Sequence, residues 1–311
     1  MAGGLLAGLR GIGRRVLAPE RPVAAVEVRQ GTLGIVRLAK EAGRATLGTA
    51  AVLELAPGTV ETSLVEPNVK DPTAFSRVLG ALMERVGLAG GGRVALVVPD
   101  AAARVALLPV AGSDLDEQVR FRLRKVVPFD VRTARVAAAA VKRDGGEAAV
   151  LAVAMARQVL EGYESVLEGA GLQVGQVELS GLAIGRHGMS GRGDSLLVNW
   201  DEGAATFVLS RDGAPLLVRS FSAEVAGRLE EVEREAASTL LYYRDRLSGT
   251  SLGEVVLRAG DGDAETARER LGEALGVEPR LVAPWGSQRG GLPDAGRAVA
   301  GAAAALLGEA A

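Results

Sequence analysis

Few side chains in this sequence could do covalent or metal chemistry. The chain has no cysteine and a single histidine, His187, so thiolate sites and sites built from several imidazoles are excluded. Ser180 is not part of a nucleophile elbow, because the motif's preceding glycine is missing. We therefore expect no catalytic residue and no metal ligand set, and interpret His187 as a packing or capping residue.

A cluster of cations is the other chemical feature. The predicted helix 114–126 carries Arg120, Arg122, Arg124 and Lys125 within two turns. Such a face can contact an acidic partner or lipid headgroups near a membrane. It can equally be a solvated face whose long side chains cover apolar surface. Both interpretations stay open.

The composition limits the classes of protein to which this chain can belong. With 311 residues, 48% of them apolar, the chain can bury a large core in two domains or one bilobal body. Its 36 basic and 38 acidic residues nearly cancel, so nucleic acid is not an expected partner. No stretch reaches the roughly 18 to 20 apolar residues that span a bilayer. Residues 1–20 lack the features of a secretory signal and are expected to be a flexible or membrane-peripheral tail. We expect a cytoplasmic protein.

The order of predicted elements is repeated along the chain. The first half gives three strands, a helix and a buried strand, at 23–28, 34–39, 46–55, 71–86 and 93–98. The second half gives three strands, a long helix, a strand and a helix, at 195–200, 206–210, 215–221, 223–247, 254–258 and 264–275. Two meanders followed by helices and strands indicate an α/β protein with the duplicated ribonuclease-H-like fold of actin.

Between the two copies lies an insertion. It has a strand at 104–108, then a helix that Ser113 and Asp116 are predicted to open as a capping box. Beyond it, we predict a strand, a helix and a strand at 148–154, 158–169 and 173–179. We therefore expect a first actin-like lobe at 21–190, with an inserted small subdomain at about 93–141, and a second lobe at 191–311.

Several segments resemble one known family. The predicted helix of the insertion runs into Val-Pro-Phe-Asp at 127–130, similar to the Ile-Pro-Phe-Asp-like turn of the PilM family of type IV pilus assembly proteins. The stretch 154–183, with its Ala-Gly-Leu turn at 170–172, is similar to another part of that family. Tyr242-Tyr243 and the segment 213–219 fit as well. The resemblance spans nearly the whole chain after Arg21.

The resemblance implies a binding function. PilM proteins are actin-like, lie at the cytoplasmic face of the inner membrane, and bind the short N-terminal peptide of the bitopic protein PilN in a groove beside the inserted subdomain. It implies a PilN-like partner here, other pilus assembly proteins, and peripheral membrane association. Within the insertion, Arg120, Arg124, Pro128 and Phe129 are the expected partner-binding residues.

The resemblance also identifies the positions that would hold a nucleotide. Actin-like ATPases grip phosphates with two hairpins, each with an aspartate and a glycine, because glycine lets the backbone approach phosphate and the carboxylate holds hydrated magnesium. At the first hairpin Glu27 replaces the aspartate and Arg29 the glycine, followed by Gly31. Further on, Gly34 stands where PilM has a lysine.

The second hairpin is altered too. Asn199 takes the aspartate's place and Asp201 the glycine's, and an added carboxylate facing a phosphate is repulsive. Gly260 and Gly262 keep part of the turn that rests against adenosine. We therefore expect a pseudo-ATPase without cofactor, with ATP and magnesium as the alternative.

Three functions remain to be compared. The first is a cytoplasmic scaffold of the type IV pilus inner-membrane complex, and the second a scaffold like the cytoplasmic domain of the type II secretion protein GspL. The third is an active ATPase or sugar-kinase-like phosphotransferase of the same fold, which needs carboxylates at both hairpins. A cell-division filament former of the actin-like fold is a further alternative.

Overall fold

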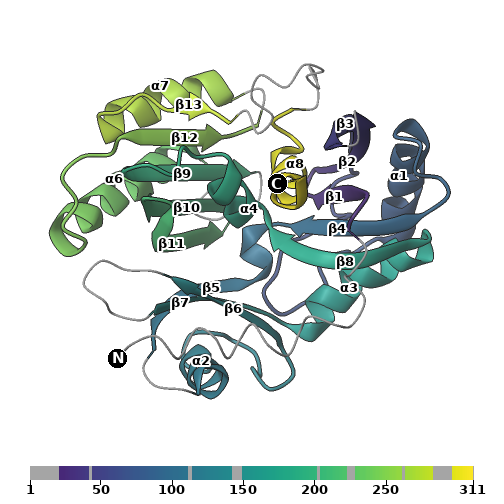
Figure 1. The fold of residues 1–311 in the computed structure, drawn as a ribbon, viewed down its shortest axis with the longest axis horizontal. Helices are drawn as coiled ribbons and strands as arrows, with labels where there is room; N and C mark the ends of the chain where they lie inside the picture. The colour runs from purple at the N-terminus through teal and green to yellow at the C-terminus, as the bar shows by residue number, and fades with distance from the viewer. Residues whose placement is uncertain are drawn as a thin grey trace.

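Two five-stranded sheets and one three-stranded sheet form the molecule (Figure 1). The computed structural model describes residues 21–41, 44–110, 114–141, 149–201, 204–222, 228–260, 263–282 and 296–310. None of the helices described in these ranges is long and apolar enough to cross a bilayer.

The first sheet has the order β3-β2-β1-β4-β8. Its strands are β1 (Ala24–Val28), β2 (Thr32–Glu41), β3 (Arg44–Glu54), β4 (Gly92–Val98) and β8 (Leu172–Leu179). Two helices, α1 (Pro72–Arg85) and α3 (Arg157–Gly169), cover one face. Asp71 caps α1 by accepting hydrogen bonds from the amides of Thr73 and Ala74. We call this part lobe 1.

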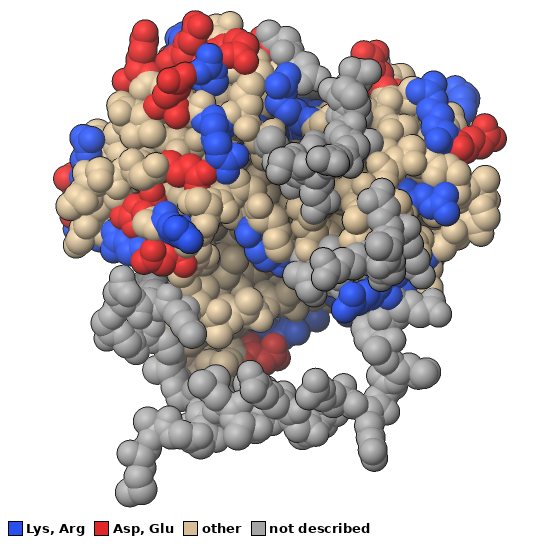
Figure 2. Space-filling view, turned by 45° about the horizontal axis from the view of Figure 1, so that its top comes forward, with Lys and Arg blue, Asp and Glu red and all other residues tan. Residues whose placement is uncertain are grey.

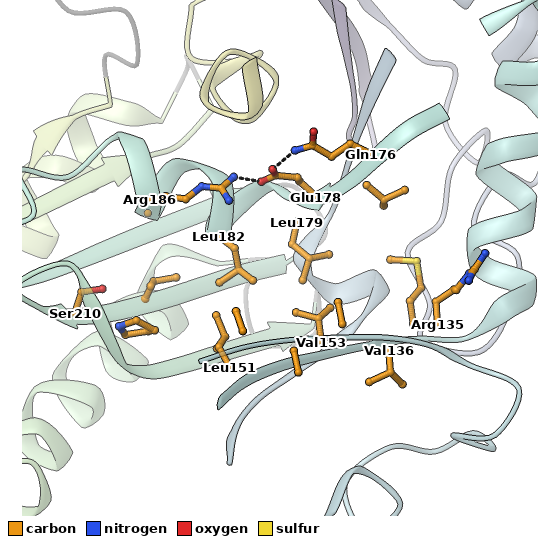
Figure 3. A pocket seen from close by; sticks show the side chains of 18 of the residues that line it. Arg135, Val136, Leu151, Val153, Gln176, Glu178, Leu179, Leu182, Arg186 and Ser210 are labelled. Atoms are coloured by element: carbon orange, nitrogen blue, oxygen red, sulfur yellow. Dashed lines mark hydrogen bonds and ion pairs between the residues drawn. The ribbon is translucent and has the colours of Figure 1, made fainter. Parts of the chain in front are cut away.

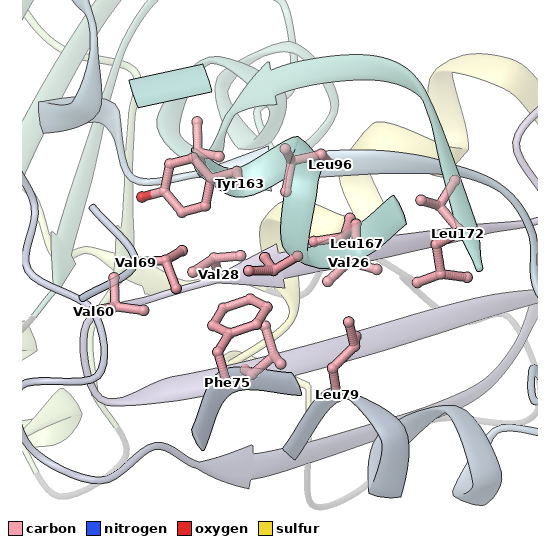
Figure 4. Close-up of a cluster of buried hydrophobic side chains, with 14 of the residues drawn as sticks. Val26, Val28, Val60, Val69, Phe75, Leu79, Leu96, Tyr163, Leu167 and Leu172 are labelled. Atoms are coloured by element: carbon pink, nitrogen blue, oxygen red, sulfur yellow. The ribbon is translucent and has the colours of Figure 1, made fainter. Parts of the chain in front are cut away.

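The core of lobe 1 follows from strand alternation. Val26 and Val28 of β1 face the helices and pack in one cluster with Phe75 and Leu79 of α1 and Leu167 of α3 (Figure 4). The side chain of Ala25, which precedes Val26, points to the opposite face, into a second cluster. Because both faces are covered, β1 is buried along its whole length.

The second sheet repeats the order of the first, as β11-β10-β9-β12-β13. Its strands are β9 (Asp194–Asp201), β10 (Ala204–Arg211), β11 (Ala214–Ser222), β12 (Glu254–Arg258) and β13 (Arg280–Leu281). With α6 (Leu229–Arg246) and α7 (Ala264–Leu275) it forms lobe 2. Each copy is an antiparallel meander whose first strand pairs in parallel with the next, β1 with β4 and β9 with β12. The predicted fold class, a duplicated actin-like α/β fold, is confirmed.

Two helices fill the space between the sheets. These are α4 (Ser180–His187) and α8 (Ala300–Ala310), which contact each other. The sequence of α8 consists largely of alanine, so its backbone approaches both sheets closely. Ala302 and Ala303 pack with Ala25 and Val97 of lobe 1. The next cluster joins Ala300 and Ala304 to strands of lobe 2.

The third sheet has the order β5-β7-β6. The insertion therefore starts after β4, which belongs to the sheet of lobe 1, and extends past the expected bound at 141 to Met155. Its strands are β5 (Arg104–Pro109), β6 (Arg135–Val141) and β7 (Ala149–Met155), and a short η2 turn (Asp100–Ala102) joins β4 to β5. Helix α2 (Leu115–Leu123) packs on one face. Its N-cap is Asp114, whose carboxylate accepts from the amide of Glu117. Ser113, the predicted cap, lies outside the described residues.

Candidate functional site

A buried ion pair joins the two lobes where the phosphate hairpins were expected. Glu27, near the end of β1, accepts a hydrogen bond of 2.8 Å from the Arg258 guanidinium at the end of β12. The exposed fraction of Glu27 is 1% and that of Arg258 is 0%. Each residue stands where its strand reaches the lobe interface, so the pair spans the cleft between the copies.

The remaining polar atoms of the pair are also occupied. The second carboxylate oxygen of Glu27 accepts from the backbone amide of Ala302 in α8, at 2.9 Å. The Ser180 hydroxyl donates to Glu27 at 3.1 Å from the start of α4. Arg258 donates to the carbonyls of Arg297 and Ala298, each at 3.1 Å. Both helices between the sheets therefore contribute to one network.

Asn199 and Asp100 extend the network. The Asn199 carbonyl oxygen accepts from Arg258 at 3.2 Å, and its amide donates to Asp100 at 2.8 Å. Asp100 also accepts from the amide of Gly181, in the first turn of α4, at 2.9 and 3.0 Å. Burial raises the pKa of the Asp100 carboxyl, and the hydrogen bonds from Asn199 and Gly181 oppose that rise.

We call this set the cleft network: Glu27, Asp100, Ser180, Asn199 and Arg258. Its members do not fit a magnesium nucleotide. A magnesium site needs a carboxylate that can reach the ion's water shell, whereas both oxygens of Glu27 are already used by the protein. A phosphate would also have to displace a carboxylate that is paired with Arg258. Among the described residues, no group of carboxylates and histidines is arranged to hold a metal ion.

Gly34 shows how closely the cleft is packed. A Cβ atom built at Gly34 would lie 2.2 Å from Cγ1 of Val299, just before α8. This position, where the resemblance implies a lysine in PilM, thus cannot hold even a methyl group unless the side chain of Val299 shifts.

The other expected nucleotide positions are spread along the strand ends. Gly31 lies in the turn between β1 and β2, and Gly260 is half-buried just after β12. Asp201 ends β9, with its side chain outside the described residues, and Gly262 also lies outside them. Of the predicted positions, the structure brings Glu27 and Asn199 together, through Arg258. Arg258 itself was predicted only as the end of a strand.

A groove of about 750 Å³ opens on the other side of the interface (Figure 3). Its floor is one face of the third sheet, with Leu151, Val153 and Met155 of β7 beside Ala137 and Ala139 of β6. Alternate residues of β7 point away from the groove into the α2 cluster. The groove floor is therefore apolar and rests on a packed layer.

The opposite wall is formed by β8, α4 and strands of lobe 2, among them β10 and β11. Strand β8 gives Val177, Glu178 and Leu179, while α4 and lobe 2 add further residues, among them Leu182, Arg186, Val208, Ser210 and Pro215. Glu178 forms an ion pair with Arg186 and accepts a hydrogen bond from Gln176 (Figure 3). The groove is thus mostly apolar, with one polar cluster on this wall, and the charged residues Arg135 and Glu164 also line it.

Strand β6 has an unusual edge. It is the last strand in the order of its sheet, and Ala137 to Ala140 are all exposed. An edge strand presents unpaired backbone amides and carbonyls, and small side chains leave them accessible. An extended peptide could therefore add beside β6 and place alternate side chains in the groove.

The expected partner-binding residues lie elsewhere on the insertion. Arg120 pairs with Asp116 at 3.1 Å, while Arg124 and Pro128 are exposed. Phe129 is half-buried and packs against the apolar clusters of lobe 1 and of the insertion. None of these four residues lines the groove, since α2 covers the opposite face of the sheet. Their contact with a partner stays a prediction.

Sequence reasoning missed the residues that do form the groove. Strand β6 was not predicted, because four consecutive alanines show no alternation of apolar and polar residues. The run of small residues next to a predicted strand was the available signal.

Comparisons with known proteins support the fold. No family model matches the chain, and no curated protein matches it. Among solved structures, a PilM–PilN type IV pilus biogenesis complex is similar, with 19% identity, a TM-score of 0.77, and coverage of 93% of this chain and 99% of that one. A Bacteroides thetaiotaomicron protein of unknown function with an actin-like ATPase fold has 11% identity and a TM-score of 0.54, covering 84% and 90%.

The cytoplasmic domain of EpsL, an inner-membrane component of the Vibrio cholerae type II secretion system, has 12% identity and a TM-score of 0.49, covering 76% and 82%. The chain has the actin-like fold, and over nearly its whole length its structure is similar to that of PilM.

Proposed function

We propose that this chain is a cytoplasmic scaffold of a type IV pilus inner-membrane complex, and that it binds the extended N-terminal peptide of a PilN-like bitopic protein in the groove. The observation that carries the proposal is the apolar groove beside the exposed, alanine-rich edge of β6. Backbone hydrogen bonds to an edge strand supply affinity for any extended peptide, and pockets for alternate side chains supply selectivity.

The cleft network supports binding rather than hydrolysis. The carboxylate at the first hairpin is paired with Arg258, and the amide that replaces the second carboxylate is bonded to the same guanidinium. We propose that neither hairpin engages ATP, so the chain acts as a pseudo-ATPase at the cytoplasmic face of the inner membrane.

Two neighbouring alanines give a matched test. Ala139 is exposed and lines the groove, whereas Ala140 is exposed on the same strand and does not line it. The N-terminal cytoplasmic peptide of a PilN-like bitopic protein from the same organism is titrated into the wild type, Ala139→Trp and Ala140→Trp. An indole at position 139 fills the groove, so we expect the affinity of Ala139→Trp to fall by about 100-fold, a loss of ~2.7 kcal/mol.

The control variant should bind like the wild type, and both variants should unfold at the same temperature as the wild type. Two results contradict the proposal: the peptide does not bind the wild type, or both tryptophan variants bind it equally well.

A further inference from the structure

The outer face of α2 carries an exposed aromatic ring held by two cations. Phe121 is 52% exposed. The Arg124 guanidinium lies 5.3 Å from the centre of its ring and the Lys125 ammonium 5.2 Å. Arg122 and Val126 are exposed beside them. We call these five residues the α2 tip: Phe121, Arg122, Arg124, Lys125 and Val126.

Among the described residues, the cations of the α2 tip form no ion pair of their own, although the charge of Arg124 acts on Asp130 from a longer distance. Two nearby carboxylates form ion pairs with other arginines, Asp116 with Arg120 and Asp130 with Arg132. The bonds from Arg132 lower the pKa of Asp130 to about 2, so Asp130 stays ionised and paired at neutral pH. In the part of the chain that the structure describes, no carboxylate lies within ion-pair distance of Arg122, Arg124 or Lys125.

Two arginines of lobe 2 differ from those of the α2 tip because they form ion pairs with carboxylates. On lobe 2, Arg270 of α7 pairs with Glu230 and Glu233 of α6, and Arg268 pairs with Glu265 and Glu278. Figure 2 shows both signs of charge interspersed there, at the upper left. Against a net charge of −2 for the whole chain, the α2 tip is a local positive site with an apolar centre.

The size and chemistry of the α2 tip favour a bilayer over an acidic protein. A stable protein interface buries about 800 Å² per partner around an apolar, well-packed centre. The tip offers one ring and one valine surrounded by cations. That combination suits a membrane interface, where aromatic rings lie at headgroup level and cations approach lipid phosphates.

We propose that the α2 tip binds the phosphate headgroups of an anionic bilayer, with Phe121 entering the interface. This goes beyond the proposed function and is independent of the groove, because α2 packs on the face of the third sheet opposite the groove floor. The cations supply long-range attraction that salt weakens, and the ring supplies a contact that salt does not weaken.

Vesicle co-sedimentation of the full chain tests the proposal. The wild type is mixed with vesicles of phosphatidylcholine and phosphatidylglycerol, and separately with phosphatidylcholine alone. We expect binding to the anionic vesicles only. One basic residue changes partitioning by about fivefold, so the double variant Arg124→Gln, Lys125→Gln should bind about 30-fold more weakly. Phe121→Ala should lower binding several-fold, and this loss should persist at high salt.

The matched control is Arg244→Gln, Arg246→Gln. These two exposed arginines at the end of α6 change the net charge by the same amount. The control should bind vesicles like the wild type, and all variants should keep the wild-type peptide affinity in the groove. The proposal is overturned by equal binding to both kinds of vesicle, by wild-type binding of the double variant, or by no vesicle binding. If the chain binds no vesicles, an acidic protein becomes the partner to test for the α2 tip.

Discussion

The cleft network and the groove are two openings between the same lobes, and they differ in whether their chemistry is already satisfied. In the cleft network the carboxylate of Glu27 and the guanidinium of Arg258 are buried and bonded to each other. In the groove, apolar side chains of β7 and β8 line an open volume beside β6, which pairs on one side only among the described strands. The groove therefore has open apolar surface that a ligand could contact, whereas the polar groups of the cleft network are bonded to one another.

The comparison teaches that two places along one lobe interface can differ, one closed by an ion pair and the other open. A buried ion pair adds little net stability compared with apolar residues, yet removing one partner is costly. The cleft network therefore fixes how the lobes meet. The groove tolerates change, because its floor rests on a separately packed layer of the insertion.

The largest expected effect comes from breaking the ion pair. Arg258→Met leaves Glu27 charged and buried, so we expect the free energy of unfolding to fall by about 3–5 kcal/mol in urea denaturation. Adding Glu27→Met should recover part of this loss. Peptide affinity under native conditions should not change. A single variant as stable as the wild type would show that the pair is not what joins the lobes.

Two glycines compare the regions directly. A Cβ at Gly34 would lie 2.2 Å from Cγ1 of the buried Val299. A Cβ at Gly175 in the groove wall would lie equally close, 2.2 Å, to Nε of Arg93, but this long side chain can move aside. We expect Gly34→Ala to cost about 1–3 kcal/mol of stability and Gly175→Ala less than about 0.5 kcal/mol, measured by thermal unfolding. Equal losses of stability in the two variants would show that the cleft and the groove are packed equally tightly, which contradicts the account.

Asp194 lies outside the cleft network and is also paired with an arginine, so it can be compared with the buried pair of Glu27 and Arg258. Asp194 accepts two hydrogen bonds of 2.7 Å from Arg211 and one from the Tyr243 hydroxyl. The bonds from Arg211, chiefly, lower the pKa of Asp194. Its stabilising contribution is therefore present above its unfolded pKa of about 3.9, and is lost as pH falls through the lower folded value.

Since this pair is partly exposed, we expect Asp194→Asn to cost only about 1–2 kcal/mol at pH 7. We expect the difference in the free energy of unfolding between this variant and the wild type to shrink below about pH 4. Urea denaturation repeated at several pH values measures it. A difference that stays constant with pH would assign the effect to packing instead.

The sequence predicted the strands of both five-stranded sheets except the two-residue β13, because turn residues and alternation mark them. Pro72 and Gly276 mark helix ends in the same way, and the structure confirms α1 and α7 at these positions. Strand β6 and helix α8 were missed, because alanine runs carry no period.

The cleft network could not be predicted either, since Glu27 and Arg258 are 231 positions apart. Periodicity describes single elements, and a contact between lobes depends on how the elements meet.

Titration calorimetry of the full chain with magnesium and ATP tests the central claim most directly. Because Arg258 already neutralises the carboxylate at the first hairpin, we predict no saturable heat up to about 1 mM nucleotide. A saturable isotherm with a micromolar Kd would mean that the lobes hold a nucleotide between them, contradicting the account.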